Sequence, residues 1–178
     1  MRSETNWHAE NAMKITVTQA TGATRFALRC RPNDSVGLGE ATGWTLGLPV
    51  LRGARTGDRA VLRLSPDEWQ LMGSLASQLK IVSEFAAASA QCVHSLVEIT
   101  DRQRALLIEG HDAAELLATG CPLDFDLAAM PVGFASRTLM WKIEIILWRQ
   151  EVKLYHIEYG RSYEQPISHL LLNAAKGL

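Results

Sequence analysis

A long segment of alternating side chains, Arg137 to Arg149, constrains the fold of this chain more than any other feature. Apolar residues recur at every second position along it, which predicts a strand with one face turned toward a core. The apolar positions are Leu139, Trp141, Ile143, Ile145 and Leu147. Lys142 and Glu144 fall on the opposite face, and residues 155–159 repeat the alternation. We therefore expect two strands in succession near the C-terminus.

Shorter strands and three helices accompany these two strands. Residues 60–64, 69–73, 93–99 and 105–108 predict strands, the first two joined by a Ser-Pro-Asp-Glu turn. A short helix is expected to begin after Asp112, which takes the capping position. The first and last helices have apolar stripes made of Leu75, Leu79, Val82 and Phe85, and of Ile167, Leu170, Leu171 and Ala174. This order predicts an α+β fold, with a mostly antiparallel sheet and helices packed on it.

The first 58 residues are patterned more weakly. Residues 13–19 and 24–30 each alternate, which predicts a hairpin. The stretch from Arg31 to Asp58 is rich in glycine and predicts a loop. We therefore expect an N-terminal arm with a hairpin and a glycine-rich loop over residues 1–58, followed by an α+β domain over residues 59–178.

Charge and hydropathy exclude two classes of partner. The chain has 18 Lys plus Arg and 19 Asp plus Glu, a formal net charge of -1, so it lacks the basic footprint of a nucleic-acid-binding protein. No uninterrupted apolar stretch approaches the roughly 20 residues that span a bilayer, so no membrane association is expected. Residues 1–10 lack a basic region followed by an apolar run, which makes the cytoplasm the expected location.

The sequence offers no recognisable site for a metal or a cofactor. The three cysteines form no Cys-x-x-Cys pair, and the five histidines form no pair four residues apart, so we expect no metal site. Gly37-Leu38-Gly39 lacks the third glycine of a dinucleotide-binding loop, so we expect no nucleotide cofactor either.

Three short features have both a chemical and a structural interpretation. Cys121 could act as a nucleophile, but no basic neighbour is present to lower its pKa, so we favour a packing role in a turn. Asp124 and Asp126 could pair for acid–base catalysis, but accepting backbone N–H bonds in a turn is the favoured role. Trp148 is expected to face away from the isoleucine side of its strand, beside Arg149. The pair fits an exposed subunit interface, and a tryptophan covered by the chain's own loop or helix is the equal alternative.

Six short motifs follow one another along residues 60–178. They are Leu64-Ser65-Pro66-Asp67-Glu68-Trp69, residues 97–102, Cys121-Pro122-Leu123-Asp124, Phe134 with Arg137-Thr138, Leu147-Trp148-Arg149, and Arg161-Ser162-Tyr163. In this order they resemble the gamma subunit of heterotetrameric sarcosine oxidase. The chain departs from that family at Ser65, where glycine is usual, and at Tyr163, where phenylalanine is usual. It also lacks a tryptophan in the last helix, and residues 1–58 match poorly.

The resemblance implies a fold related to the folate-binding domain of the glycine-cleavage aminomethyltransferase. It also implies a non-catalytic structural subunit that binds no cofactor. The partners would be the alpha, beta and delta subunits, which hold FAD, FMN, NAD, tetrahydrofolate and zinc. That complex demethylates sarcosine oxidatively to glycine, transfers the one-carbon unit to tetrahydrofolate and produces hydrogen peroxide.

Two other functions remain open. One is a gamma-type subunit of another N-methyl amino-acid oxidase or dehydrogenase. The other, from a different class, is a stand-alone folate-binding aminomethyltransferase-like protein, although such an enzyme is about two domains long. A folate-binding protein of iron–sulfur assembly is disfavoured, because the expected Lys-Gly-Cys-Tyr run is absent.

Overall fold

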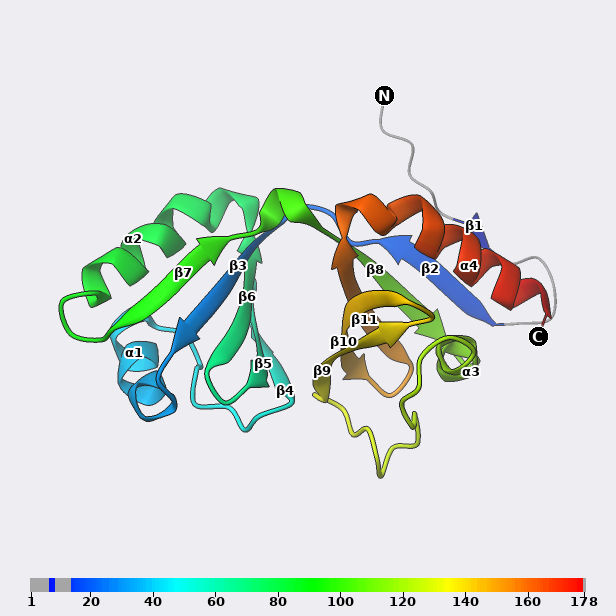
Figure 1. Cartoon of the computed structure of the whole chain (residues 1–178), viewed down its shortest axis with the longest axis horizontal. Coiled ribbons are helices and arrows are strands. Elements are labelled where there is room, and N and C mark those ends of the chain that lie inside the picture. The colour runs from blue at the N-terminus through cyan, green and yellow to red at the C-terminus, as the bar shows by residue number, and fades with distance from the viewer. Residues whose placement is uncertain (1–6, 9–13, 178) are drawn as a thin grey trace. The chain divides into compact units, whose positions relative to one another are not determined.

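The computed structural model of the chain describes residues 7–8 and 14–177, and these form two compact units (Figure 1). Unit 2 runs from Gly22 to Thr100, and unit 1 comprises the described residues up to Thr21 and from Asp101 onward. The boundary expected after residue 58 differs from this division, because it falls in the turn between two paired strands of unit 2.

Unit 2 is a five-stranded antiparallel sheet covered on one face by two helices (Figure 1). The strands, in spatial order, are β4 (Arg52–Thr56), β5 (Arg59–Ser65), β6 (Glu68–Ser74), β3 (Ala23–Cys30) and β7 (His94–Glu98). The helices are α1 (Ser35–Thr42) and α2 (Gln78–Ala88). Leu38 of α1 and Phe85 of α2 pack with Trp69 and Leu71 of the central strand β6 to form the core. Each is at most 1% exposed, so this core is closed within the unit.

Unit 1 has a six-stranded antiparallel sheet and its own core. The strands, in spatial order, are β1 (Trp7–His8), β2 (Ile15–Gln19), β8 (Gln103–Gly110), β11 (Leu154–Gly160), β10 (Ile143–Glu151) and β9 (Ala135–Met140). The helices are α3 (Ala113–Ala118) and α4 (Glu164–Gly177). Leu117 of α3 and Leu171 of α4 pack on Ile157 and Leu147 of the central strands, which places both helices against one face of the sheet.

The α+β class with mostly antiparallel pairing is confirmed, although the strands form two sheets instead of one. The predicted segment Arg137 to Arg149 is not one strand. It is the hairpin β9–β10, whose turn contains Trp141 with a backbone φ of 53°. Trp141 leaves the strand because its backbone N–H donates to the carbonyl of Gly120 (2.6 Å). Its indole ring packs where a side chain at residue 120 would lie. Leu139 is consequently half-exposed and does not enter the core.

Two expectations for the N-terminal part are wrong. Met13 lies outside the described residues, and the strands at 15–19 and 23–30 both form, but they do not pair as a hairpin. β2 pairs with β8, whereas β3 pairs with β6 and β7. The glycine-rich stretch from Arg31 to Asp58 is not loop throughout, since it contains α1 and β4. Gly39 allows the segment after α1 to pack closely on the helix, because a Cβ there would lie 2.5 Å from the carbonyl oxygen of Trp44.

The two long helices differ in how well their apolar stripes were predicted. In α4 the predicted stripe faces the core, with Ile167 and Leu171 fully buried. In α2 the buried residues are Ile81, Phe85 and Ala88, whereas three of the four predicted positions are exposed. The short helix α3 does follow Asp112, but that carboxylate makes no side-chain cap hydrogen bond. It accepts from the backbone N–H of Lys14 (2.9 Å) and lies 2.6 Å from His111 Nδ1.

Gly110 at the end of β8 provides a test of the pairing between β8 and β2. Its φ is +140°, and a Cβ would lie 1.9 Å from the carbonyl oxygen of Lys14. We expect Gly110→Ala to lower the free energy of unfolding by more than the roughly 1–3 kcal/mol of backbone strain, because the two strands must also separate.

Gly37→Ala in α1 is the matched control. A Cβ at residue 37 meets nothing within 4 Å, so the change should be neutral or should stabilise the chain by up to about 1 kcal/mol. Urea denaturation followed by circular dichroism measures both. Equal stability of the Gly110→Ala protein and the wild type would contradict the register of these strands.

Candidate functional site

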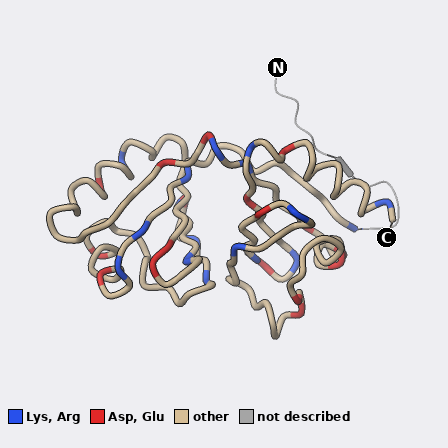
Figure 2. Tube along the Cα trace, viewed as in Figure 1, with Lys and Arg blue, Asp and Glu red and all other residues tan. Residues whose placement is uncertain are grey.

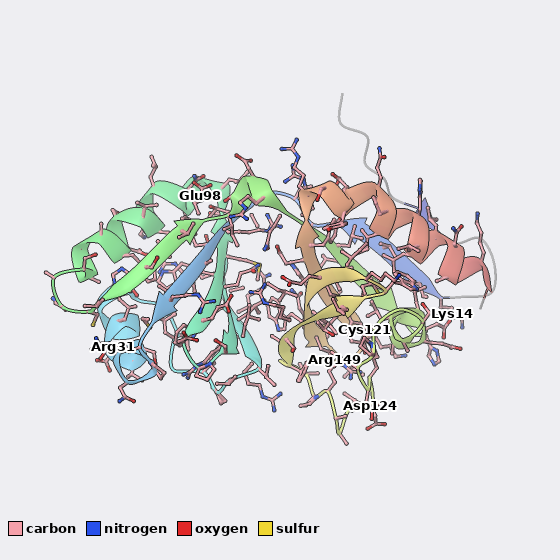
Figure 3. The ribbon with its side chains drawn as sticks, in the orientation of Figure 1. Lys14, Arg31, Glu98, Cys121, Asp124 and Arg149 are labelled. Carbon is pink, nitrogen blue, oxygen red and sulfur yellow. The ribbon has the colours of Figure 1, made fainter. Side chains whose placement is uncertain are left out.

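The loop from Cys121 to Phe134, here called the 121–134 loop, gathers several of the motif residues in unit 1 (Figure 3). Arg149 of β10 holds it from within. One guanidinium nitrogen donates to the carbonyls of Phe125 (2.9 Å) and Met130 (2.7 Å), and the other terminal nitrogen donates to the carbonyl of Val152 (2.7 Å). The guanidinium carbon also lies 5.1 Å from the ring centroid of Tyr155. A rigid fork of donors can satisfy several carbonyls at once, so Arg149 fixes the loop against the sheet.

The expectation that Trp148 and Arg149 form an exposed pair is wrong. Their exposed fractions are 3% and 4%. Trp148 does face away from the isoleucine side of β10, as alternation predicts, because it pairs across the sheet with His156, and their ring centroids are 6.0 Å apart. The Arg149 side chain turns to backbone carbonyls inside unit 1. Arg149 therefore stabilises unit 1 itself. The exposure on which the interface prediction for the pair rested is absent, and the interface role itself stays a prediction.

Cys121 and the two aspartates have the structural roles favoured from the sequence. The Cys121 side chain is buried, its Sγ lies 3.9 Å from Thr138 Oγ1, and burial raises the pKa of the thiol. Asp124 Oδ1 accepts the backbone N–H of Asp126 (2.9 Å), and Asp126 Oδ1 accepts the N–H of Ala128 (2.8 Å). Each carboxylate thus stabilises a turn of the loop.

The remaining motif residues lie elsewhere. Trp69 is buried in unit 2, where its Nε1–H donates to the carbonyl of Leu46 (3.0 Å). Arg137 of β9 forms a solvent-accessible ion pair with Glu144 of β10 (2.8 Å). Arg161 and Ser162 form an exposed 3₁₀ turn that leads into α4, and Pro122 is exposed at the start of the 121–134 loop.

A cavity of about 360 Å³ in unit 1, lined in part by Leu106 and Tyr159, was missed by sequence reasoning. It lies where the start of α4 meets β2. Gln19 Nε2 donates to Glu164 Oε1 (2.8 Å) at its edge, and Arg104 lies 3.9 Å from the other carboxylate oxygen. No motif indicates this cavity, because its lining comes from residues scattered over more than 150 positions of the chain.

Within residues 7–8 and 14–177, no three His, Cys, Asp or Glu side chains are grouped closely enough to hold a metal ion. His94 Nδ1 lies 2.8 Å from the carbonyl of Cys92, and His156 Nε2 lies 2.7 Å from Glu158 Oε1 inside unit 1. In the same described part, no helix combines the length and apolarity needed to cross a bilayer.

The contacts of Arg149 predict a large cost for its removal. We expect Arg149→Met to lower the free energy of unfolding by about 2–5 kcal/mol, since two buried carbonyls lose their donors. Arg149→Lys should restore part of that loss, because an ammonium group reaches fewer of the three carbonyls. The exposed Arg161→Met control should stay within about 0.5 kcal/mol of wild type. Urea denaturation of the wild type and the three variants measures these differences. An Arg149→Met chain as stable as the wild type would show that the loop is held by other contacts.

The cysteines should differ sharply in reactivity. Burial raises the pKa of Cys30 to about 11 and also raises that of Cys121, so both remain thiols at neutral pH, and only Cys92 is partly exposed. We expect Ellman's reagent to modify Cys92 quickly in the native chain and the other two only after denaturation in urea. A Cys92→Ser variant that still reacts quickly would show that a buried thiol is accessible.

Comparisons with known proteins agree with this fold. No family model matches the chain. Sarcosine oxidase subunit gamma of Corynebacterium sp. (strain U-96) is 28% identical over 165 residues, a match that covers 90% of this chain and 78% of that protein.

Solved structures extend the comparison. The heterotetrameric sarcosine oxidase of Corynebacterium sp. U-96 contains a chain that matches with a TM-score of 0.83 and 25% identity, over 92% of this chain and 84% of that one. The glycine cleavage system aminomethyltransferase T of Bartonella henselae shares the fold, with a TM-score of 0.68 at 10% identity, over 90% of this chain and 46% of that enzyme. Sequence and fold together confirm the expected resemblance: over nine-tenths of its length, this chain is similar to the gamma subunit of heterotetrameric sarcosine oxidase.

Proposed function

We propose that this chain is the non-catalytic structural subunit of a heterotetrameric sarcosine oxidase. The observation that carries the proposal is the match to a chain of such an oxidase over 92% of this chain, with a TM-score of 0.83. The similarity runs through both units, so it concerns the chain as a whole and not one shared domain.

The contacts of the most reactive residue types support a structural role. Catalysis by a cysteine needs an accessible thiolate, whereas Cys121 is buried with a raised pKa. Asp124 uses one carboxylate oxygen to accept a backbone N–H bond within a turn. Arg149 is committed to three backbone carbonyls. These side chains stabilise the fold and leave the chemistry to partner chains.

In this proposal the alpha, beta and delta subunits bind FAD, FMN, NAD, tetrahydrofolate and zinc. The complex demethylates sarcosine oxidatively to glycine, passes the one-carbon unit to tetrahydrofolate and reduces oxygen to hydrogen peroxide. This chain contributes surfaces that hold the large subunits in the assembled state.

Co-expression of the full chain with the other subunits tests the proposal. We expect the chain to co-purify with them in fixed stoichiometry, and the complex to consume oxygen and form hydrogen peroxide when sarcosine is added. The chain purified alone should show no flavin absorbance, and co-expression without it should give a lower yield of assembled oxidase.

The outcomes separate the alternatives. Faster turnover of a different N-methyl amino acid would make the chain a gamma-type subunit of another oxidase or dehydrogenase. Tight binding of tetrahydrofolate by the isolated chain, without any association, would favour a stand-alone aminomethyltransferase-like protein. A flavin that stays with the isolated chain would contradict the non-catalytic role.

A further inference from the structure

Helix α2 of unit 2 is apolar on two opposite sides. Its inner side, formed by Ile81, Phe85 and Ala88, packs into the core. Its outer face consists of residues that are all exposed and small or apolar: Leu75 and Ala76 of the preceding 3₁₀ turn, then Leu79, Val82, Ser83, Ala86, Ala87 and Ala90. We call this set the outer face of α2.

The exposure of this face is large. Leu79 is 83% exposed, Leu75 is 51% exposed and Val82 is 44% exposed. A helix that is hydrophobic all round is normally buried all round, and contiguous exposed apolar residues mark interaction surfaces. Nothing in the fold of unit 2 requires leucine at residue 79, because the inner side alone supplies the packing on the sheet.

The outer face of α2 is bordered by one exposed cation of the helix and by no exposed anion of the helix. Lys80 and Glu84 are the charged residues between positions 75 and 90, and α2 is otherwise uncharged along the chain trace (Figure 2). Glu84 is turned toward β5 and the connection after α1, where its carboxylate accepts from Arg59 Nη2 (2.6 Å) and Trp44 Nε1 (3.2 Å). Lys80 is exposed, at the border of the apolar residues.

Helix α4 provides an internal comparison. It covers the sheet of unit 1 as α2 covers the sheet of unit 2, and its buried stripe is equally apolar. Apart from Pro166 in the first turn and Gly177 at the end, its exposed positions are polar: Gln165, His169, Asn173 and Lys176. An apolar outer face is therefore not a general property of the helices in this chain, and it needs an explanation specific to α2.

We infer that the outer face of α2 is a docking surface for another subunit of the oxidase, one that offers an apolar, largely uncharged surface with a carboxylate opposite Lys80. The inference rests on the proposed function and adds the surface that performs it. In a symmetric contact each copy would present the same face, which has no carboxylate to pair with Lys80. The chain that matches over 92% of this one belongs to a heterotetrameric oxidase, so an unlike subunit is the occupant that the comparison supports. Desolvating a lone cation is costly unless an opposite charge pairs with it. These points favour an unlike partner over a second copy.

Two pairs of charge insertions test the surface. The full chain is combined with the complex of the other subunits, and the dissociation constant is measured. We expect Leu79→Glu with Ser83→Glu to raise the dissociation constant at least tenfold, because two carboxylates then stand among the apolar side chains of this face. The matched control, His169→Glu with Asn173→Glu on α4, has the same charges at the same spacing and should change it less than twofold. Lys80→Glu should weaken binding, and Lys80→Arg should preserve it.

Measurements on the isolated variants distinguish a loss of binding from a loss of folding. All substituted side chains are exposed, so the circular dichroism and thermal midpoint of each isolated variant should match those of the wild type. If the double glutamate variant of α2 does misfold, Leu79→Ala replaces it and should still weaken binding. Wild-type affinity in the α2 variants, or equal losses in the α4 control, would overturn the docking surface while leaving the proposed function intact.

Two further results would contradict the choice of partner or the proposed function itself. A wild-type chain that dimerises alone, with the dimer abolished by Leu79→Glu, would assign the face to a second copy and refute the unlike partner. A wild-type chain that binds none of the other subunits would refute both this inference and the proposed function.

Discussion

The guanidinium of Arg149 is the interaction on which the irregular part of unit 1 depends. The fourteen residues of the 121–134 loop form neither helix nor strand, yet Phe125 and Met130 within them are buried. Buried carbonyls without donors would destabilise the chain, and a side chain that reaches two of them from the adjacent sheet removes that cost. The charge itself is tolerated because it is hydrogen-bonded to carbonyl dipoles and lies against the ring of Tyr155.

In unit 2 a sheet side chain likewise holds an irregular segment by a hydrogen bond to a backbone carbonyl. Trp69 spans the core and donates its indole N–H to the carbonyl of Leu46 in the connection after α1, while the Arg63 guanidinium lies 4.8 Å from its ring centroid. Trp69, a large side chain in the centre of the sheet, thus fixes the irregular connection that contains Leu46. In both units a polar group of a large sheet residue, the guanidinium of Arg149 or the indole N–H of Trp69, holds an irregular segment against the sheet.

Local periodicity predicted most of the elements but not their partners. Alternation identified β2, β3, β7 and β11 and most of β10, because strand side chains repeat every two residues and that signal is local. Whether β2 pairs with β3 or with β8 depends on contacts some ninety residues apart, which no local pattern contains. The turn at Trp141 was invisible for a similar reason, since it depends on the carbonyl of Gly120.

The face of a helix is predictable only when one side is clearly more apolar. α4 satisfies this condition, whereas in α2 Leu79 and Ile81 are equally good candidates for the core and only the structure selects Ile81. The burial of Arg149 was likewise unpredictable, because the preference of arginine for exposed positions is statistical and its hydrogen-bond partners are distant in sequence. Only the turn roles of Asp124 and Asp126 followed from residues within two positions.

The burial of the thiols has a consequence for chemical durability. Peroxides oxidise the thiolate form of cysteine, and they do so fastest where that form is accessible to solvent. Cys30 and Cys121 are enclosed and remain protonated at neutral pH. In the complex proposed above, which forms hydrogen peroxide at each turnover, two of the three sulfhydryl groups of this chain would therefore be in the protonated form, which peroxide oxidises most slowly.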